Sequence, residues 1–143
     1  MNRGTYEEEI SKARFDLFSQ AMYTLSKMSD YELIDVANQY FDLAHYPDDH
    51  IYIKSDFDTL FEGQSPSEIA KQMKNIPADS EYFWYDGYGK LNGTSRVEGL
   101  SIDIDSIATY VSDNEESFGN STLEDLVSEY RDKISDIESD YER

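Results

Sequence analysis

The stretch YFWYDGYGKLNG, residues 82–93, places five aromatic residues and three glycines within twelve positions. Aromatic residues are enriched in strands and glycines in turns, so this composition predicts a strand that runs into a turn. TSRVEGL, residues 94–100, is the expected returning strand of a β-hairpin. Because the four consecutive rings at 82–85 would cover both faces of the first strand, we expect it to be the central strand of a small sheet. HIYIK, residues 50–54, alternates polar and apolar residues and is the predicted third strand.

Both ends of the chain carry apolar residues at helical spacing. Residues 5–28 repeat apolar side chains every three or four positions, and Thr5 and Glu8 are spaced as a capping box. SDYE, residues 29–32, signals the start of a second helix, whose pattern continues until Pro47. The N-terminal part of the chain is therefore expected to form a helical hairpin.

Shorter helical signals lie between the predicted strands. SDFDTLFEG, residues 55–63, predicts one or two helical turns that end at Gly63. Ser65 and Glu68 form a capping box around Pro66, which would occupy the first helical position. This combination is a specific signal for a helix start, so another short helix is expected here.

The C-terminal third contains one ambiguous segment and one clear helix. IDIDSIATYVSDN, residues 102–114, begins with a strand-like alternation but also fits a helix capped by Asp103 or Asp105, and the helix is favoured. Ser121 and Glu124 then open a last helix. Its apolar positions are Leu123, Leu126, Val127, Tyr130, Ile134, Ile137 and Tyr141.

The predicted fold class is therefore α+β, with an N-terminal helical hairpin, a small antiparallel sheet of about three strands and C-terminal helices packed on it. The length suits a single domain over residues 1–143, since a second independent core would have too few residues. Either a monomer or a homodimer is expected. The homodimer would pair through the N-terminal helical hairpin, because Phe15, Phe18, Met22 and Tyr23 widen the apolar surface of its first helix.

Charge sets the main limits on function. The chain has 31 acidic and 12 basic residues, which gives a formal net charge of -19. A field of this sign repels nucleic acid and anionic membranes, so direct binding to either is not expected. It attracts basic surfaces, including those with which other proteins bind DNA or RNA. The alternative is that the charge serves only solubility.

The sequence contains no pattern that indicates catalysis, a cofactor or a metal site. Cysteine is absent, which excludes disulfides, thiolate nucleophiles and cysteine metal sites, and fits a reducing cytoplasm. His45 and His50 flank a predicted surface turn and lack a third ligand at metal spacing. No P-loop, dinucleotide-binding glycine pattern or serine nucleophile motif occurs. Because no catalytic motif occurs, enzymatic activity is not expected. No stretch approaches the ~20 apolar residues of a membrane span, and a cytoplasmic protein is expected.

The aromatic run is expected to serve mainly the core. Proteins that stack bases on aromatic side chains combine them with a basic groove, whereas only Lys90 and Arg96 lie near this run. Tyr88, which lies between two glycines, and Tyr85 are left as candidate contact residues for a protein partner.

Acidic residues concentrate in the last third of the chain, where residues 101–143 carry thirteen acids and three bases. Five acids on the last predicted helix follow one another after four, three, four and four residues. This spacing places them along one face at intervals of roughly 5 to 6 Å, a pitch in the range of phosphate spacing along a nucleic-acid strand, whose axial repeat is about 3.4 Å. The alternative is a solvated helix face. The five residues of this acidic row are Asp125, Glu129, Asp132, Asp136 and Asp140, and the preceding loop adds Asp113, Glu115 and Glu116 as candidate partner contacts.

A resemblance to known proteins covers about half of the chain. It rests on FDTLFEGQSPSEIAKQM, on YFWYDGYGKLNG and on SIATYVSDNEES. These stretches resemble small acidic accessory proteins of phages and other bacterial mobile elements. The resemblance implies a bacterial host and a setting in which DNA-mimicking inhibitors of restriction enzymes and CRISPR nucleases are common, and it assigns no functional residues.

Two functions are expected as alternatives. In the first, the protein is a non-enzymatic inhibitor whose acidic residues bind a basic nucleic-acid channel, such as that of a Cas9-type nuclease, and compete with DNA. In the second, it is an adaptor or immunity-like protein whose aromatic hairpin binds a partner through Tyr88, while the acidity serves only solubility.

Overall fold

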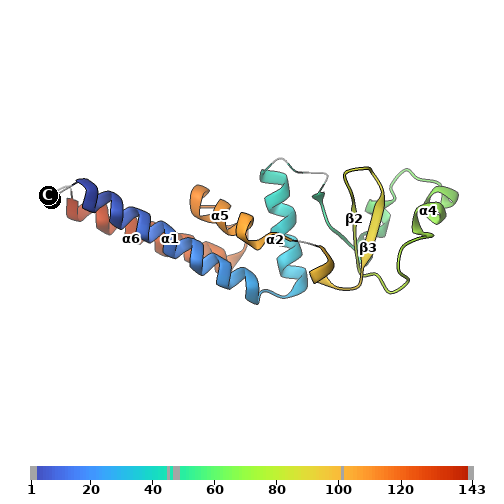
Figure 1. Ribbon diagram of the computed structural model, residues 1–143, viewed down its shortest axis with the longest axis horizontal. Coiled ribbons are helices and arrows are strands. Elements are labelled where there is room, and N and C mark those ends of the chain that lie inside the picture. Colours follow the sequence, from blue (N-terminus) through green and yellow to red (C-terminus); the bar gives the residue numbers. More distant parts are fainter. Residues whose placement is uncertain (1–2, 45, 47–48, 101, 142–143) are drawn as a thin grey trace. The chain divides into compact units, whose positions relative to one another are not determined.

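The computed structural model describes residues 3–44, 46, 49–100 and 102–141, so His45, Pro47 and Asp48 of the predicted turn lie outside the described residues. Helices occupy both ends of the chain, and the strands of a three-stranded antiparallel sheet come between them in the sequence, which confirms the predicted α+β class (Figure 1). The chain divides into two compact units, which are described separately. The helical unit contains residues 1–36 and 103–143, and the sheet unit contains residues 37–102. The single domain stays a prediction.

The helical unit is built around the first helix of the chain. Helix α1 (Arg3–Lys27) packs against both α5 (Ile104–Asn114) and α6 (Ser121–Tyr141), and Figure 1 shows α6 running alongside α1. Within this unit α5 and α6 pack on α1. The expected packing of these helices on the sheet stays a prediction. The side chains buried in this unit include Ala13, Leu17, Ala21 and Leu25 of α1, Ile107, Ala108 and Val111 of α5, and Leu123, Val127 and Tyr130 of α6.

The predicted helix starts are confirmed for α2 and α5 and corrected for α1 and α6. Helix α2 (Asp30–Leu43) follows Ser29, whose hydroxyl accepts a hydrogen bond from the backbone N–H of Glu32. Asp103 caps α5 by accepting the N–H of Ser106 at 3.2 Å, which resolves the ambiguity at residues 102–114 in favour of the helix. Thr5 is not a cap, because α1 already begins at Arg3. Helix α6 is capped one residue earlier than predicted, since the Asn120 side chain accepts the N–H of Leu123 at 3.0 Å.

The sheet of the second unit has the order β1 (Tyr52–Ile53), β2 (Tyr82–Tyr85), β3 (Leu91–Thr94), so the aromatic strand is central as predicted. The prediction placed the returning strand too late in the chain, at residues 94–100. The turn after Tyr85 closes within five residues, and β3 therefore begins at Leu91, while Val97–Leu100 forms a 3₁₀ turn.

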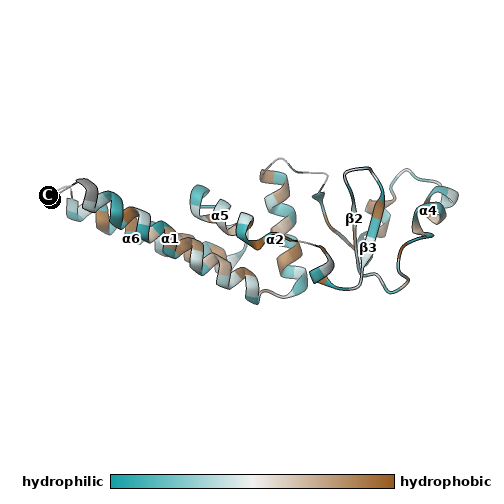
Figure 2. Cartoon of the chain, viewed as in Figure 1, coloured by the Kyte–Doolittle hydropathy of each residue, from teal (hydrophilic) through white to brown (hydrophobic). Residues whose placement is uncertain are grey.

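A second core packs on this sheet. It contains Leu60, Phe61, Phe83 and Leu91, and further side chains from α3 (Phe57–Leu60) and α4 (Pro66–Met73) cover it. Ser65 caps α4 through the N–H of Glu68, which confirms the predicted helix start. In Figure 2, hydrophobic and hydrophilic residues alternate along the helices, as expected for elements that bury one side only.

One anchor of the sheet unit is invisible in the sequence pattern. The side-chain amide of Asn38 donates to the carbonyl of Ile51 at 2.9 Å, and the N–H of Ile51 donates back to the Asn38 carbonyl oxygen at 2.8 Å. This pair of bonds attaches the second half of α2 to the segment that enters β1. An asparagine within a helical pattern carries no signal of such a partner thirteen residues away.

Candidate functional site

Helix α6 holds the acidic row on its solvent side. Leu123, Val127 and Tyr130 are buried at three- and four-residue spacing, so the opposite side of the helix faces away from the packing partner. All five members of the acidic row are exposed: Asp125, Glu129, Asp132, Asp136 and Asp140. The first and the last are fifteen positions apart, which corresponds to a row of about 22 Å on a straight helix.

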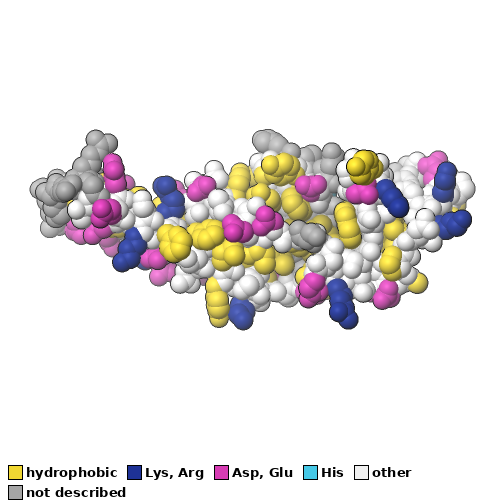
Figure 3. Space-filling model, viewed as in Figure 1, with side chains coloured by type: hydrophobic (Ala, Val, Ile, Leu, Met, Phe, Trp, Pro, Cys, Tyr) yellow, Lys and Arg dark blue, Asp and Glu magenta, His cyan; other side chains and the backbone are white. Residues whose placement is uncertain are grey.

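The carboxylates of the acidic row are left for solvent or for a partner. Among the described residues, none of the five forms an ion pair or a hydrogen bond. Figure 3 shows acidic side chains spread over the helical part of the visible face, with basic side chains set singly among them. A row of like charges on a rigid rod keeps a fixed spacing, which a disordered acidic tail does not.

The three loop acids have different roles. Glu115 lies in the left-handed region at φ 52° and its carboxylate is 3.2 Å from Nε of Arg131, which ties the end of α5 to α6. Glu116 accepts the N–H of Phe118 at 3.0 Å and so helps to shape the loop. Asp113 is exposed at the end of α5. Of the loop acids predicted to contact a partner, two therefore contribute to local structure as well.

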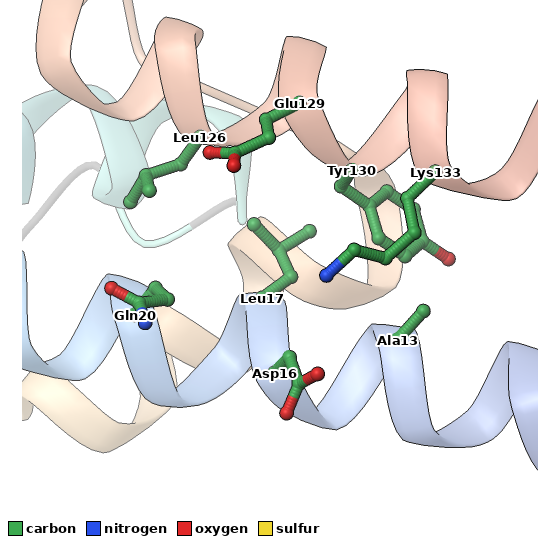
Figure 4. Close-up of a pocket in the computed structure, with 8 residues that line it drawn as sticks. All are labelled: Ala13, Asp16, Leu17, Gln20, Leu126, Glu129, Tyr130 and Lys133. Carbon is green, nitrogen blue, oxygen red and sulfur yellow. The ribbon is translucent and has the colours of Figure 1, made fainter.

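A groove borders the acidic row between α1 and α6. Its volume is about 430 Å³, and Glu129 contributes to its rim (Figure 4). Figure 4 shows Lys133 extending from α6 toward α1, with its ammonium group between the two helices. Asp16 and Gln20 contribute the rim from α1. The sequence did not indicate this groove, because the side chains that form it are more than a hundred residues apart and meet only when α1 pairs with α6.

Tyr88 belongs to the sheet unit and forms a second candidate surface. Its side chain is 97% exposed at the tip of the β2–β3 turn. The turn is held by Asp86, which accepts the N–H groups of Tyr88 at 2.9 Å and Lys90 at 3.0 Å. Asn92 adds a side-chain bond to the same carboxylate at 3.2 Å. The predicted site residues therefore fall into two units, and the acidic row and Tyr88 are two separate candidates. Tyr85, in contrast, is half-buried and its hydroxyl donates to Gln72.

The hydrogen bonds to Asp86 predict a pH-dependent turn. The backbone N–H of Lys90, followed by that of Tyr88, lowers the pKa of Asp86 below its ordinary value. Because the pKa is lower in the folded state than in the unfolded state, the carboxylate stabilises the turn above an unfolded pKa of about 3.9. This stabilisation is lost as the pH falls through the lower folded pKa. The amide signals of Tyr88 and Lys90 should titrate by NMR with a midpoint below about 3.9.

The control for this titration is Asp86→Asn, which keeps the side-chain shape and removes the charge. It should abolish the titration of both amides. A midpoint at or above the ordinary aspartate value would show that these bonds do not favour the ionised form.

The apolar surface expected on the first helix is partly exposed. Phe15 and Tyr23 are both 64% exposed, while Phe18 and Met22 are half-buried. Figure 3 shows hydrophobic side chains gathered over α1. The choice between monomer and homodimer stays a prediction.

Comparison of the chain with protein-family models, with curated proteins and with solved structures finds no match. None of the described helices has both the length and the apolar character needed to cross a membrane. In the described ranges, no three His, Cys, Asp or Glu side chains are grouped so that they could hold a metal ion.

Proposed function

We propose that the protein is a non-enzymatic inhibitor that binds a basic nucleic-acid-binding surface of a bacterial defence nuclease, of the CRISPR or restriction type, and competes with DNA. The observation that carries the proposal is the acidic row, five exposed carboxylates on the solvent side of one helix, none of them paired among the described residues. A basic channel that normally binds phosphates attracts such a row by the same long-range field. The action would take place in the cytoplasm of a bacterial host, where such nucleases meet DNA.

The mechanism is occupancy, without a chemical step. The acidic row runs for about 22 Å on one helix, and its carboxylates take the place of successive phosphates at the channel surface. Helix α6 is held by the buried residues Leu123, Val127 and Tyr130, so the spacing of the charges is set before binding. A preordered surface loses little conformational entropy on association, which favours a tight complex.

The test is binding to a purified Cas9-type nuclease with its guide RNA and to a purified restriction endonuclease. The variant carries Asp125→Asn, Glu129→Gln, Asp132→Asn and Asp136→Asn. Loss of four charge contacts should weaken binding by about 10- to 100-fold, and wild-type affinity should fall steeply as salt is raised from about 0.05 to 0.2 M. Calorimetry or surface plasmon resonance over this salt range measures both effects.

The matched control removes the same number of charges elsewhere. Its substitutions are Asp42→Asn, Asp58→Asn, Glu62→Gln and Asp79→Asn, all at exposed positions of the sheet unit. If the acidic row makes the contacts, this control should bind within about threefold of the wild type. Its net charge equals that of the acidic-row variant, so a difference in affinity between the two variants comes from the position of the charges and not from total charge. Equal weakening by both variants would mean that only total charge matters, and unchanged binding by the variant would contradict the proposal.

A second function is favoured by the exposure of Tyr88. A tyrosine that is 97% exposed on a turn fixed by three hydrogen bonds is a preordered anchor for a pocket on a partner. In this adaptor or immunity-like function, Tyr88→Ala would weaken partner binding by about tenfold or more, while the acidic-row variant would bind normally. The same binding measurements therefore separate the two functions.

A further inference from the structure

A second groove runs along the α1–α6 pair, closer to the ends where α1 begins and α6 finishes. Its volume is about 450 Å³, within the range of small-molecule and side-chain pockets. Ile10 of α1 and Ile134 of α6 line it as apolar side chains. The two helices run in opposite directions. Near the start of α1, the Tyr6 hydroxyl donates to Oε1 of Glu138, near the end of α6, at 3.5 Å, while Gln20 further along α1 lines the first groove together with Leu126 near the start of α6.

One end of this groove is acidic. Glu138 lies there beside Tyr6, whose ring makes an edge contact with Tyr141 at 5.1 Å between centroids. Partial burial and the neighbouring carboxylates of Glu9, Asp140 and Glu8 raise the pKa of Tyr141. Several carboxylates thus gather around an aromatic pair, which is an environment that attracts a cation.

The other end of the groove carries hydrogen-bond donors and one carboxylate. Arg14, Tyr130 and Glu115 line it. The Glu115 carboxylate is paired with Arg131, while Arg14 forms no ion pair within the described part of the chain. Tyr130 is only 8% exposed, yet its hydroxyl has no hydrogen-bond partner among the described residues. In Figure 4 this hydroxyl points away from Leu17, along the direction in which α6 runs from Leu126 to Lys133. The ring of Tyr130 is buried while its hydroxyl is accessible from the groove, so the hydroxyl can form a hydrogen bond with a polar group that enters there.

We propose that this groove receives one arginine side chain of the protein partner, with its guanidinium at Glu138 and its backbone carbonyl facing Arg14 and the Tyr130 hydroxyl. The two ends are separated by about 10 to 12 Å along the helices, so a residue with a long side chain can reach both. The methylene stem lies over Ile10 and Ile134, and the planar guanidinium pairs with the carboxylate and stacks on Tyr6. The inference rests on the proposed function for its source of arginine, the basic surface of a nuclease.

The test uses the full chain with labelled isoleucine methyl groups, observed by NMR during titration with the blocked peptide acetyl-Gly-Arg-Gly-amide. The matching peptide has citrulline, a neutral analogue, in place of arginine. The methyl signals of Ile10 and Ile134 should move with the arginine peptide and stay in place with the citrulline peptide. Movement with both peptides, or with neither, overturns the inference.

Three variants assign the two ends of the groove. Glu138→Gln should lower the affinity for the arginine peptide by about five- to tenfold, because a charge-assisted hydrogen bond is lost. Tyr130→Phe keeps the buried ring and should lower the affinity for this peptide by about two- to fivefold. Glu124→Gln makes the same chemical change on the same helix, at an exposed position outside both the groove and the acidic row, and should bind the peptide as the wild type does. Equal affinity of Glu138→Gln and Glu124→Gln for the peptide overturns the inference.

These results are independent of the acidic row. If the four-residue variant of the acidic row no longer binds any nuclease but still shows the isoleucine shifts, the groove is supported. If nuclease binding depends on the acidic row while Glu138→Gln changes neither nuclease nor peptide affinity, the groove is overturned and the proposed function stands.

Discussion

Replacing Phe83 with alanine should remove most of the stability of the sheet unit. Phe83 is 1% exposed in the centre of β2, and its ring lies 4.9 Å from that of Phe57. A phenylalanine truncated to alanine in such a core costs about 3 to 5 kcal/mol, through lost burial and the cavity left behind. A small unit has only a modest free energy of unfolding, so this loss is a large fraction of it.

The single tryptophan of the chain makes this loss measurable. Trp84 is the next residue of β2, so its fluorescence reports on the sheet unit during urea unfolding. The midpoint should fall by about 2 M for Phe83→Ala, given a slope of roughly 1 to 3 kcal/mol per molar urea. Tyr88→Ala also removes a ring, but from a side chain that is 97% exposed, and should shift the midpoint by less than about 0.5 M. Similar small shifts for both variants would contradict the packing of β2.

Leu123→Ala is expected to have a comparable effect on the helical unit. Leu123 is 0% exposed in the first turn of α6, directly after its cap at Asn120. Truncation of a fully buried leucine costs about 2 to 5 kcal/mol. An isolated helix is marginal in water, so α6 depends on this packing, and the acidic row depends on α6 for its spacing.

Thermal unfolding followed by circular dichroism at the helical band measures this effect. The control is Leu43→Ala, because Leu43 is 43% exposed at the end of α2 and loses little burial on truncation. The melting temperature should fall by about 8 °C or more for Leu123→Ala and by only a few degrees for Leu43→Ala. Equal melting temperatures would show that α6 does not depend on its first turn for stability.

The helices were predictable because their signals are local. In α6 and α1, apolar residues recur at three- and four-residue intervals over several turns, and Ser29, Ser65 and Asp103 mark helix starts by their capping chemistry. The aromatic run likewise identified the central strand. The cap at Asn120 was missed because Ser121 and Glu124 have capping-box spacing, and sequence alone does not show which polar side chain accepts the bond.

The errors and omissions arise where structure depends on distant residues or on side-chain geometry. The returning strand begins earlier than predicted because Asp86 closes a tight turn with its own carboxylate, a bond that glycine content alone does not reveal. The packing of α5 and α6 on α1 joins the two ends of the chain, and residue patterns do not specify which apolar faces meet. Both grooves along the α1–α6 pair follow from that packing, so they were not predictable.

The candidate site also has features that the sequence predicted and features that it did not. The acidic row was predictable to the residue, because a helical period places Asp125 through Asp140 on one face without knowledge of any other element. The pairing of Glu115 with Arg131 and the hydrogen bond from the N–H of Phe118 to Glu116 were not predictable, because they depend on the loop conformation between α5 and α6. The loop has left-handed backbone at both Glu115 and Phe118, and neither residue type favours that conformation.

The most direct test of the central claim is displacement of DNA. Fluorescence anisotropy would follow a labelled duplex bound to each purified nuclease while the protein is added, with the acidic-row variant and the variant of four sheet-unit acids as comparisons. We expect the wild type and the sheet-unit variant to release the duplex at similar concentrations, and the acidic-row variant to need at least tenfold more. Release of the duplex by the acidic-row variant at the wild-type concentration, or binding of the wild type to the nuclease without release, would contradict the account.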